Sequence, residues 1–189
     1  MAARVREHAT YEDLLQVPEN LVAELIDGEL VTSPRPAGPH TFASSAIGVF
    51  VGGPFGFGRG GPGGWWILDE PELHFRQNVL VPDLAGWRRE RMPEIPKHHM
   101  FSVVPDWVCE IVSPSSGRRD RMEKMPIYGR ADVGHLWLLD PEQQTLEVYE
   151  NSAQGWRRLD VPIDPPVVRV PPFDAIEMDL TLIWGPSPA

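Results

Sequence analysis

Two short segments near the start of the chain alternate apolar and polar residues and are separated by a two-residue turn. Residues 22–26 and 29–32 alternate as half-buried strands do, and Asp27-Gly28 between them is a dipeptide typical of tight hairpins. Upstream, Thr10 and Asp13 have the spacing of a helix-capping box, which predicts a short first helix at about residues 10–17. The pattern therefore predicts a helix followed by a β-hairpin.

In the middle of the chain the spacing of apolar residues changes twice, from a helical pattern to a glycine-dense stretch and then to a strand pattern. Residues 40–51 place apolar side chains on one side of a helix, and the glycine-dense residues 52–64 predict a loop. This loop lacks the residues and spacing of phosphate-binding glycine motifs, so we favour a flexible loop over a nucleotide site. Residues 65–75 and 79–87 predict two strands joined by a turn at Gln77-Asn78, with Asp83 inside the second strand.

The most apolar strand in the sequence covers residues 107–112, which predicts a place at the centre of a sheet that is covered on both faces. Residues 119–130 predict a helix that Pro126 distorts or restarts, and residues 135–140 and 145–150 predict two further strands. We expect an α/β (α+β) fold with one mixed central sheet flanked by helices. We also expect a single domain over residues 1–189, with a core at about 10–150 and an irregular C-terminal segment at about 160–189.

Composition narrows the classes of function. The chain has 189 residues, of which 42% are hydrophobic, and its single cysteine excludes an internal disulfide framework and a cysteine-rich zinc site. It has no apolar run long enough for a membrane span and no secretory signal at its start, so a cytoplasmic protein is expected. The net charge of −10 argues against a large non-specific DNA-binding surface. It does not argue against a nuclease, because carboxylates that hold cations contribute to this charge.

Two carboxylates inside apolar strands are the main candidates for chemistry. Asp83 and Glu110 are costly to bury without partners, and if their strands are neighbours, about 4.8 Å apart, both side chains can reach one ion. Mg²⁺-dependent phosphodiester hydrolysis uses one or two such carboxylates. The alternative is a purely structural role, in which a basic group or a proton stabilises them. Asp106, in a second Pro-Asp pair, lies roughly 13 Å from Glu110 along an extended strand, so we interpret it as a strand-opening residue.

Several motifs, taken in order, resemble the Uma family of restriction-endonuclease-like proteins in the PD-(D/E)XK nuclease superfamily. Pro82-Asp83 and Glu110-Ile111-Val112 are similar to the metal-binding motif of the superfamily. The resemblance covers most of residues 10 to 150. It rests on residues 24–30, Ser33-Pro34 with His40, residues 81–84, residues 110–115, Arg119-Asp120 with Glu123-Lys124, Tyr128, and residues 137–141.

The resemblance implies a restriction-endonuclease-like core and a site for Mg²⁺, with Mn²⁺ as a substitute. Asp83, Glu110 and the carbonyl of Ile111 would hold the metal, and Glu24 would be a third carboxylate that assists it or a water. The superfamily places a lysine where this chain has Val112, which cannot donate a hydrogen bond. In the Uma pattern Lys124 would replace it, so the implied catalytic residues are Asp83, Glu110, Lys124 and Glu24. The alternative for Glu24 is a structural role as a residue on the polar side of the alternating hairpin.

Basic residues flank the two acidic positions. Arg88, Arg119 and Arg121 are predicted to contact substrate phosphates, although a solvated face paired with acidic neighbours explains them equally well. His40 is a further candidate for substrate binding, with packing at a helix start as the alternative. We therefore predict a metal-dependent endonuclease that acts on DNA and not at a membrane, with a homodimer as the candidate assembly. The alternative is a catalytically inactive nuclease fold that serves as a nucleic-acid or protein interaction module.

Overall fold

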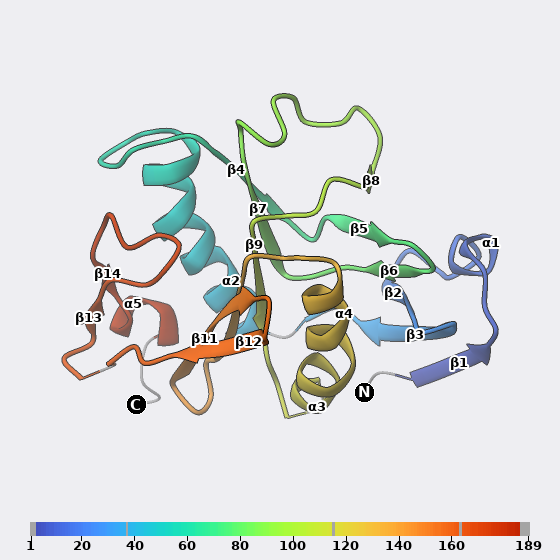
Figure 1. The fold of residues 1–189 in the computed structure, drawn as a ribbon. Coiled ribbons are helices and arrows are strands. Elements are labelled where there is room, and N and C mark those ends of the chain that lie inside the picture. The colour runs from blue at the N-terminus through green and yellow to red at the C-terminus, as the bar shows by residue number, and fades with distance from the viewer. Residues whose placement is uncertain (1–2, 37, 115, 163, 186–189) are drawn as a thin grey trace.

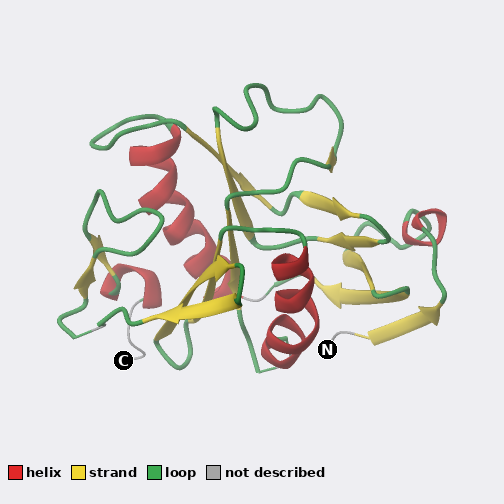
Figure 2. Ribbon diagram, in the orientation of Figure 1, coloured by secondary structure: helices red, strands yellow, loops and turns green. Residues whose placement is uncertain are grey.

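The computed structural model describes residues 3–36, 38–114, 116–162 and 164–185. Within these residues the strands form two six-stranded sheets and one two-stranded pair (Figures 1 and 2). Helices flank the sheets, and both large sheets contain parallel as well as antiparallel pairs. The expected α/β (α+β) class with mixed sheets and flanking helices is therefore confirmed, whereas the expectation of one sheet is wrong.

The central sheet has the strand order β12-β11-β10-β9-β7-β4. Only β9 and β10 run parallel, and the remaining pairs are antiparallel. All five residues of β9 are buried, so its predicted position inside a sheet covered on both faces is confirmed. The strands are β4 (Trp65–Asp69), β7 (Leu84–Arg88), β9 (Trp107–Ile111), β10 (His135–Asp140), β11 (Thr145–Ser152) and β12 (Gly155–Leu159).

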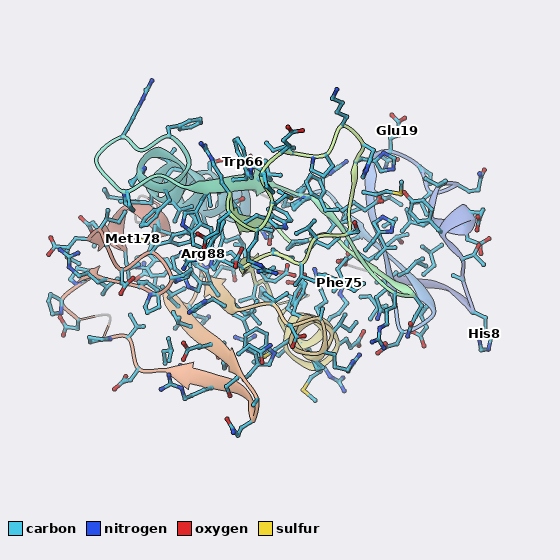
Figure 3. All side chains as sticks on the ribbon, turned by 45° about the horizontal axis from the view of Figure 1, so that its top comes forward. His8, Glu19, Trp66, Phe75, Arg88 and Met178 are labelled. Carbon is cyan, nitrogen blue, oxygen red and sulfur yellow. The ribbon has the colours of Figure 1, made fainter. Side chains whose placement is uncertain are left out.

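The two faces of the central sheet pack into two different cores. On one face, Cys109 and its same-face neighbours pack against α2 (Gly38–Val51) and α5 (Thr181–Trp184). On the other face, Val108 and its neighbours pack against α4 (Met125–Arg130) and the second sheet. The helices α2 and α4 lie on opposite sides of β9 (Figure 1). Met178 belongs to the first core and Phe75 to the second (Figure 3).

The second sheet has the order β1-β3-β2-β6-β5-β8 and contains the predicted hairpin. Asp27 and Gly28 both have positive φ angles, 47° and 85°, as a two-residue hairpin turn that matches strand twist requires. Helix α1 (Tyr11–Leu14) begins with the predicted capping box of Thr10 and Asp13. The strands are β1 (Ala3–Glu7), β2 (Leu21–Ile26), β3 (Glu29–Pro34), β5 (Glu72–Phe75), β6 (Asn78–Leu80) and β8 (Met100–Phe101).

Two of the predicted strands are each broken into two. Residues 65–75 split into β4 and β5 around Pro71, and residues 79–87 split into β6 and β7 around Pro82. Proline has no N–H to donate to a sheet ladder. At each of these two points the chain leaves one sheet and enters the other. As a result Asp83 lies in the bend between β6 and β7, and the prediction that it lies within a strand is wrong.

Helical segments contain π-helical turns at two places. The first turn of the expected loop at residues 52–64 is instead a π-helical turn, η1 (Gly52–Gly56), which buried Phe55 anchors in the first core. The helix predicted at residues 119–130 consists of α3 (Gly117–Arg119), a π-helical turn η2 (Asp120–Lys124) and α4. Pro126 is the second residue of α4, in the turn that follows η2, and it cannot donate to the helical ladder, so its predicted distorting effect is confirmed.

The C-terminal segment contains β13 (Val167–Val168), β14 (Met178–Asp179) and α5. Phe173 and Ile183 from this segment are almost fully buried in the first core, so much of the segment is packed against the central sheet. Among the helices described, none is both long enough and apolar enough to cross a membrane.

Candidate active site

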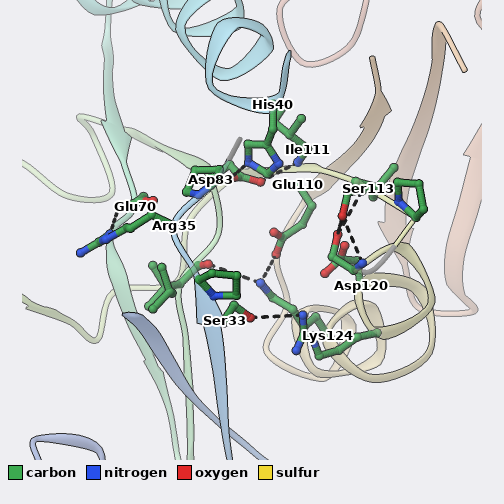
Figure 4. Close-up of a pocket in the computed structure, with 18 of the residues that line it drawn as sticks. Ser33, Arg35, His40, Glu70, Asp83, Glu110, Ile111, Ser113, Asp120 and Lys124 are labelled. Atoms are coloured by element: carbon green, nitrogen blue, oxygen red, sulfur yellow. Dashed lines mark hydrogen bonds and ion pairs between the residues drawn. The ribbon is translucent and has the colours of Figure 1, made fainter. Parts of the chain in front are cut away.

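A cavity of about 420 Å³ lies where β7 begins and β9 ends, between the start of α2 and the α3–η2 helix (Figure 4). Strands β7 and β9 are paired, with Leu84 opposite Cys109, so Asp83 and Glu110 are the next positions across this pair. The charged and imidazole side chains that line the cavity are Glu24, Arg35, His40, Glu70, Asp83, Glu110, Arg119, Asp120, Lys124 and Glu142.

Asp83 is held by two donors. Its Oδ1 accepts a hydrogen bond from His40 Nε2 at 2.5 Å, and its Oδ2 accepts one from the backbone N–H of Ile111 at 2.7 Å. His40 comes from the first turn of α2 and Ile111 from the end of β9, so two separate elements fix this carboxylate. The bend at Pro82 frees Asp83 from the ladder and turns it into the cavity (Figure 4).

Lys124 lies at the centre of a buried charge cluster. Its Nζ is 2.7 Å from Glu110 Oε1, 2.8 Å from Glu24 Oε1 and 3.3 Å from the carbonyl oxygen of Val81. An ammonium group has three N–H donors, and here three acceptors are available to them. Glu24 also accepts the backbone N–H of Val81 at 3.0 Å, so this single lysine links β2, β9 and the chain just before Asp83.

Glu110 faces the helix that carries Lys124 because it has the same strand parity as Val108, which belongs to the second core. Glu110 is 4% exposed as a residue. Its Oε1 accepts a hydrogen bond from the Tyr128 hydroxyl at 2.6 Å as well as one from the Lys124 ammonium. Both neighbours come from one helical segment, four residues apart. The helix therefore provides the basic group that Val112 cannot provide.

The cluster holds more buried acid than base. Glu24, Glu110 and Asp120 are buried beside the single ammonium of Lys124. Burial disfavours the ammonium, but Glu110, Glu24 and Asp120 outweigh that effect and raise the pKa of Lys124. Burial raises the pKa of Asp120 to about 6 and that of Glu110 well above its usual value, and in both cases Lys124 only partly opposes the shift. Lys124 is thus a permanent cation, and the surplus negative charge needs protons or another cation.

The structure brings together some of the other predicted residues and separates the rest. Arg119 lines the cavity; its Nη2 is 3.4 Å from Ser33 Oγ, and its buried Nε has no hydrogen-bond partner in the part of the chain that is described. Arg121 instead contacts Glu147, outside the cavity lining. Arg88 lies at the opposite end of β7 from Asp83, over the ring of Trp65.

Asp106, the rival to Asp83, lies immediately before β9 and away from the cavity lining. It accepts the backbone N–H of Arg88 at 2.8 Å and pairs with Arg91 Nη1 at 2.7 Å. It therefore supports the connection between β7 and β9 and does not take part in the cluster at the other end of these strands.

Several residues that line the cavity or, like Tyr128, contact a residue that lines it were not selected from the sequence as site residues. Asp120 and Tyr128 flank Lys124 at intervals of four residues, which places all three near one face of the helix. This spacing was a usable signal, but it does not say which strand the face meets. Arg35 and Glu70, which form an ion pair of 2.7 Å at the cavity edge, carry no local signal at all because they lie on different connections (Figure 4).

The residues at the cavity suit a hard divalent cation. Among the described residues, no group of three or more His, Cys, Asp and Glu side chains is placed to hold a metal ion. A Mg²⁺ site needs fewer protein ligands, because it keeps several waters and uses one or two carboxylates. Asp83, Glu110 and the Ile111 carbonyl are oxygen donors of that kind, and the surplus of buried acid beside Lys124 leaves negative charge for a cation to balance.

Comparisons with known proteins show the fold and the family of the chain. A crystal structure titled "putative nuclease belonging to DUF820", from Anabaena variabilis ATCC 29413, superposes with a TM-score of 0.73 at 24% identity, covering 93% of this chain and 97% of that one. This likeness shows the fold. No curated protein matches the chain. The model of the Uma2 family, described as "Putative restriction endonuclease", matches residues 9–182. The chain therefore belongs to the Uma2 family.

Proposed function

We propose that this protein is a Mg²⁺-dependent endonuclease that hydrolyses phosphodiester bonds in DNA. Membership of a family described as "Putative restriction endonuclease" supports nuclease action on nucleic acid. The observation that carries the more specific proposal is the meeting of Asp83, Glu110 and Lys124 at one cavity, from three separate elements. It supplies two carboxylates that can hold a metal ion and one cationic side chain that can offset charge on a phosphate, as metal-assisted phosphodiester hydrolysis can use.

In the proposed site, Asp83, Glu110 and the carbonyl of Ile111 hold the cation. When bound, Mg²⁺ polarises the phosphodiester and lowers the pKa of a water at the site. The hydrogen bonds from His40 and from the Ile111 N–H hold the Asp83 carboxylate in place. Mn²⁺, which accepts the same oxygen donors, is expected to substitute.

Lys124 contributes a fixed positive charge. Because its pKa is raised, it stays protonated and cannot act as a general base. Two of its contacts are shorter than 3 Å, and the contact to the Val81 carbonyl at 3.3 Å is the weakest. That third N–H is the one Lys124 can redirect to a phosphate oxygen or an attacking water. Glu24 positions Lys124. Arg119, from the same helical segment, also lines the cavity, and within the described residues its buried Nε has no hydrogen-bond partner.

The competing proposal is a catalytically inactive nuclease fold that binds nucleic acid or protein. It is supported by Val112 at the usual lysine position and by the three protein acceptors that already surround Lys124. In this reading Lys124 does no more than neutralise buried acids. The two proposals differ in whether the protein cleaves nucleic acid, and the nuclease proposal requires that this cleavage depend on Asp83.

A plasmid-nicking assay with Mg²⁺ or Mn²⁺ separates them. The test variant is Asp83→Asn, and the matched control is Asp106→Asn in the other Pro-Asp pair, which lies away from the cavity. We expect metal-dependent cleavage of DNA by the wild type and by Asp106→Asn, and its loss in Asp83→Asn. Single-stranded DNA and RNA substrates, run in parallel, test the assignment of DNA. Absence of cleavage of every substrate by the wild type would favour the interaction module.

A further inference from the structure

Each of the three tyrosines in the chain places its hydroxyl on a glutamate. Tyr11 donates to Glu72 Oε1 at 2.7 Å and Tyr149 to Glu147 Oε2 at 2.6 Å, and both tyrosines are partly exposed. Tyr128 differs from them because it is fully buried and its glutamate is Glu110. A buried phenol hydroxyl needs an acceptor, but it does not need a carboxylate at the candidate active site.

The contacts of Glu110 are unequal at its two oxygens. The Tyr128 hydroxyl at 2.6 Å and the Lys124 ammonium at 2.7 Å both fall on Oε1. Each carboxylate oxygen has two lone-pair directions, so these two donors use the hydrogen-bonding capacity of Oε1. Oε2 receives neither of them and is the oxygen left for another partner.

Packing keeps Tyr128 in this position. The side chain is 0% exposed in the second core, where its ring meets the ring of Phe75 edge-on at 6.2 Å. A ring that is packed on all sides has no alternative rotamer available at low cost. The hydroxyl is therefore a rigid donor.

We propose that Tyr128 is a positioning residue for the nuclease site: its hydroxyl, together with Lys124, occupies Glu110 Oε1 and so presents Oε2 to the cation. This inference rests on the proposed function, and it names a residue whose role there is to orient a ligand. Groups that hydrogen-bond to metal ligands commonly change metal affinity when they are removed.

The test compares Mn²⁺ binding by the wild type, Tyr128→Phe and Tyr149→Phe, measured by electron paramagnetic resonance and by calorimetry. Tyr149→Phe removes an equivalent tyrosine–glutamate hydrogen bond outside the cavity lining. We expect Tyr128→Phe to bind Mn²⁺ about 10–100-fold more weakly and Tyr149→Phe to bind it as the wild type does. Equal affinity in wild type and Tyr128→Phe would overturn the positioning role and leave the proposed function intact. Absence of Mn²⁺ binding in the wild type would overturn both.

A second measurement does not depend on the stability of the Tyr128→Phe protein. Uniform labelling of the wild type with 3-fluorotyrosine gives one ¹⁹F resonance for each of the three tyrosines, assigned with Tyr11→Phe and Tyr149→Phe. Mn²⁺ is paramagnetic, and we expect it to broaden the Tyr128 resonance before the other two. Broadening of another tyrosine first, or of all three equally, would contradict the assignment.

Discussion

The two faces of the central sheet are built from the same strands but differ in chemistry: one is apolar, and the other holds buried charged groups. Along β9, Trp107, Cys109 and Ile111 enter a core that is apolar throughout, under α2 and α5. On the other face the neighbour of Val108 is Glu110, which meets a buried lysine. The first face is stabilised by apolar burial. On the second face, the desolvation cost of the buried charged groups offsets part of that stabilisation, so these groups need partners. We therefore place the proposed function on the second face.

The largest expected effect tests the charged face. Lys124→Met keeps the side-chain length but leaves Glu24 and Glu110 buried without the ammonium that pairs with both. Removal of one partner from a buried ion pair lowers the free energy of unfolding by about 3–5 kcal/mol. Urea denaturation at pH 7.5 measures it, with exposed Lys97→Met as the control. The loss should shrink at pH 5, where the acids take up protons, and a full-sized loss at both pH values would contradict this account.

The apolar face should respond differently. Leu139 is fully buried in the first core, and Leu139→Ala should lower the free energy of unfolding by about 2–5 kcal/mol through the cavity it creates. No titratable group takes part, so we expect the same loss at pH 5 and pH 7.5. A strong pH dependence would mean that the two faces are not independent.

Asp120→Asn is expected to raise the free energy of unfolding near neutral pH, an effect smaller than the largest loss above and of opposite sign. The pKa of Asp120 is raised from 3.8 to about 6 in the folded protein, so the folded state holds this proton more tightly than the unfolded chain does. Stability is therefore lost as the pH rises from near 3.8 through about 6. Asparagine removes that loss and can keep the hydrogen bond to Ser116.

Relative to wild type, Asp120→Asn should gain about 3 kcal/mol in the free energy of unfolding between pH 3.5 and pH 7.5. Urea denaturation at the two pH values measures this gain. A variant that is less stable than the wild type at pH 7.5 would show instead that the Asp120 charge is needed to balance Lys124.

Local signals in the sequence predicted the elements whose chemistry is local. The hairpin follows from Asp27-Gly28, and the buried central strand follows from the apolar run that contains Cys109. The breaks at Pro71 and Pro82 were missed because the apolar pattern continues across them, although proline cannot donate to a ladder. That error also placed Asp83 in a strand instead of in a bend.

The site was only partly predictable for a geometric reason. Arg88 is close to Asp83 in sequence, but five residues of extended strand separate the two by about 17 Å, so it lies at the wrong end of β7 for the cavity. Conversely, Tyr128 and Glu110 are 18 positions apart and in contact, because strand parity and helix face happen to coincide. Which helix face meets which strand is a tertiary property, and no single segment of sequence contains it.

The central claim is that Asp83 and Glu110 share one divalent cation on the charged face. Anomalous scattering from a crystal grown with Mn²⁺ tests it most directly. The account predicts one peak within about 2.0–2.3 Å of oxygens from both carboxylates, close to the carbonyl of Ile111. A peak elsewhere, such as beside Glu72 and His74, or clear density for both carboxylates with no peak at saturating Mn²⁺, would contradict it.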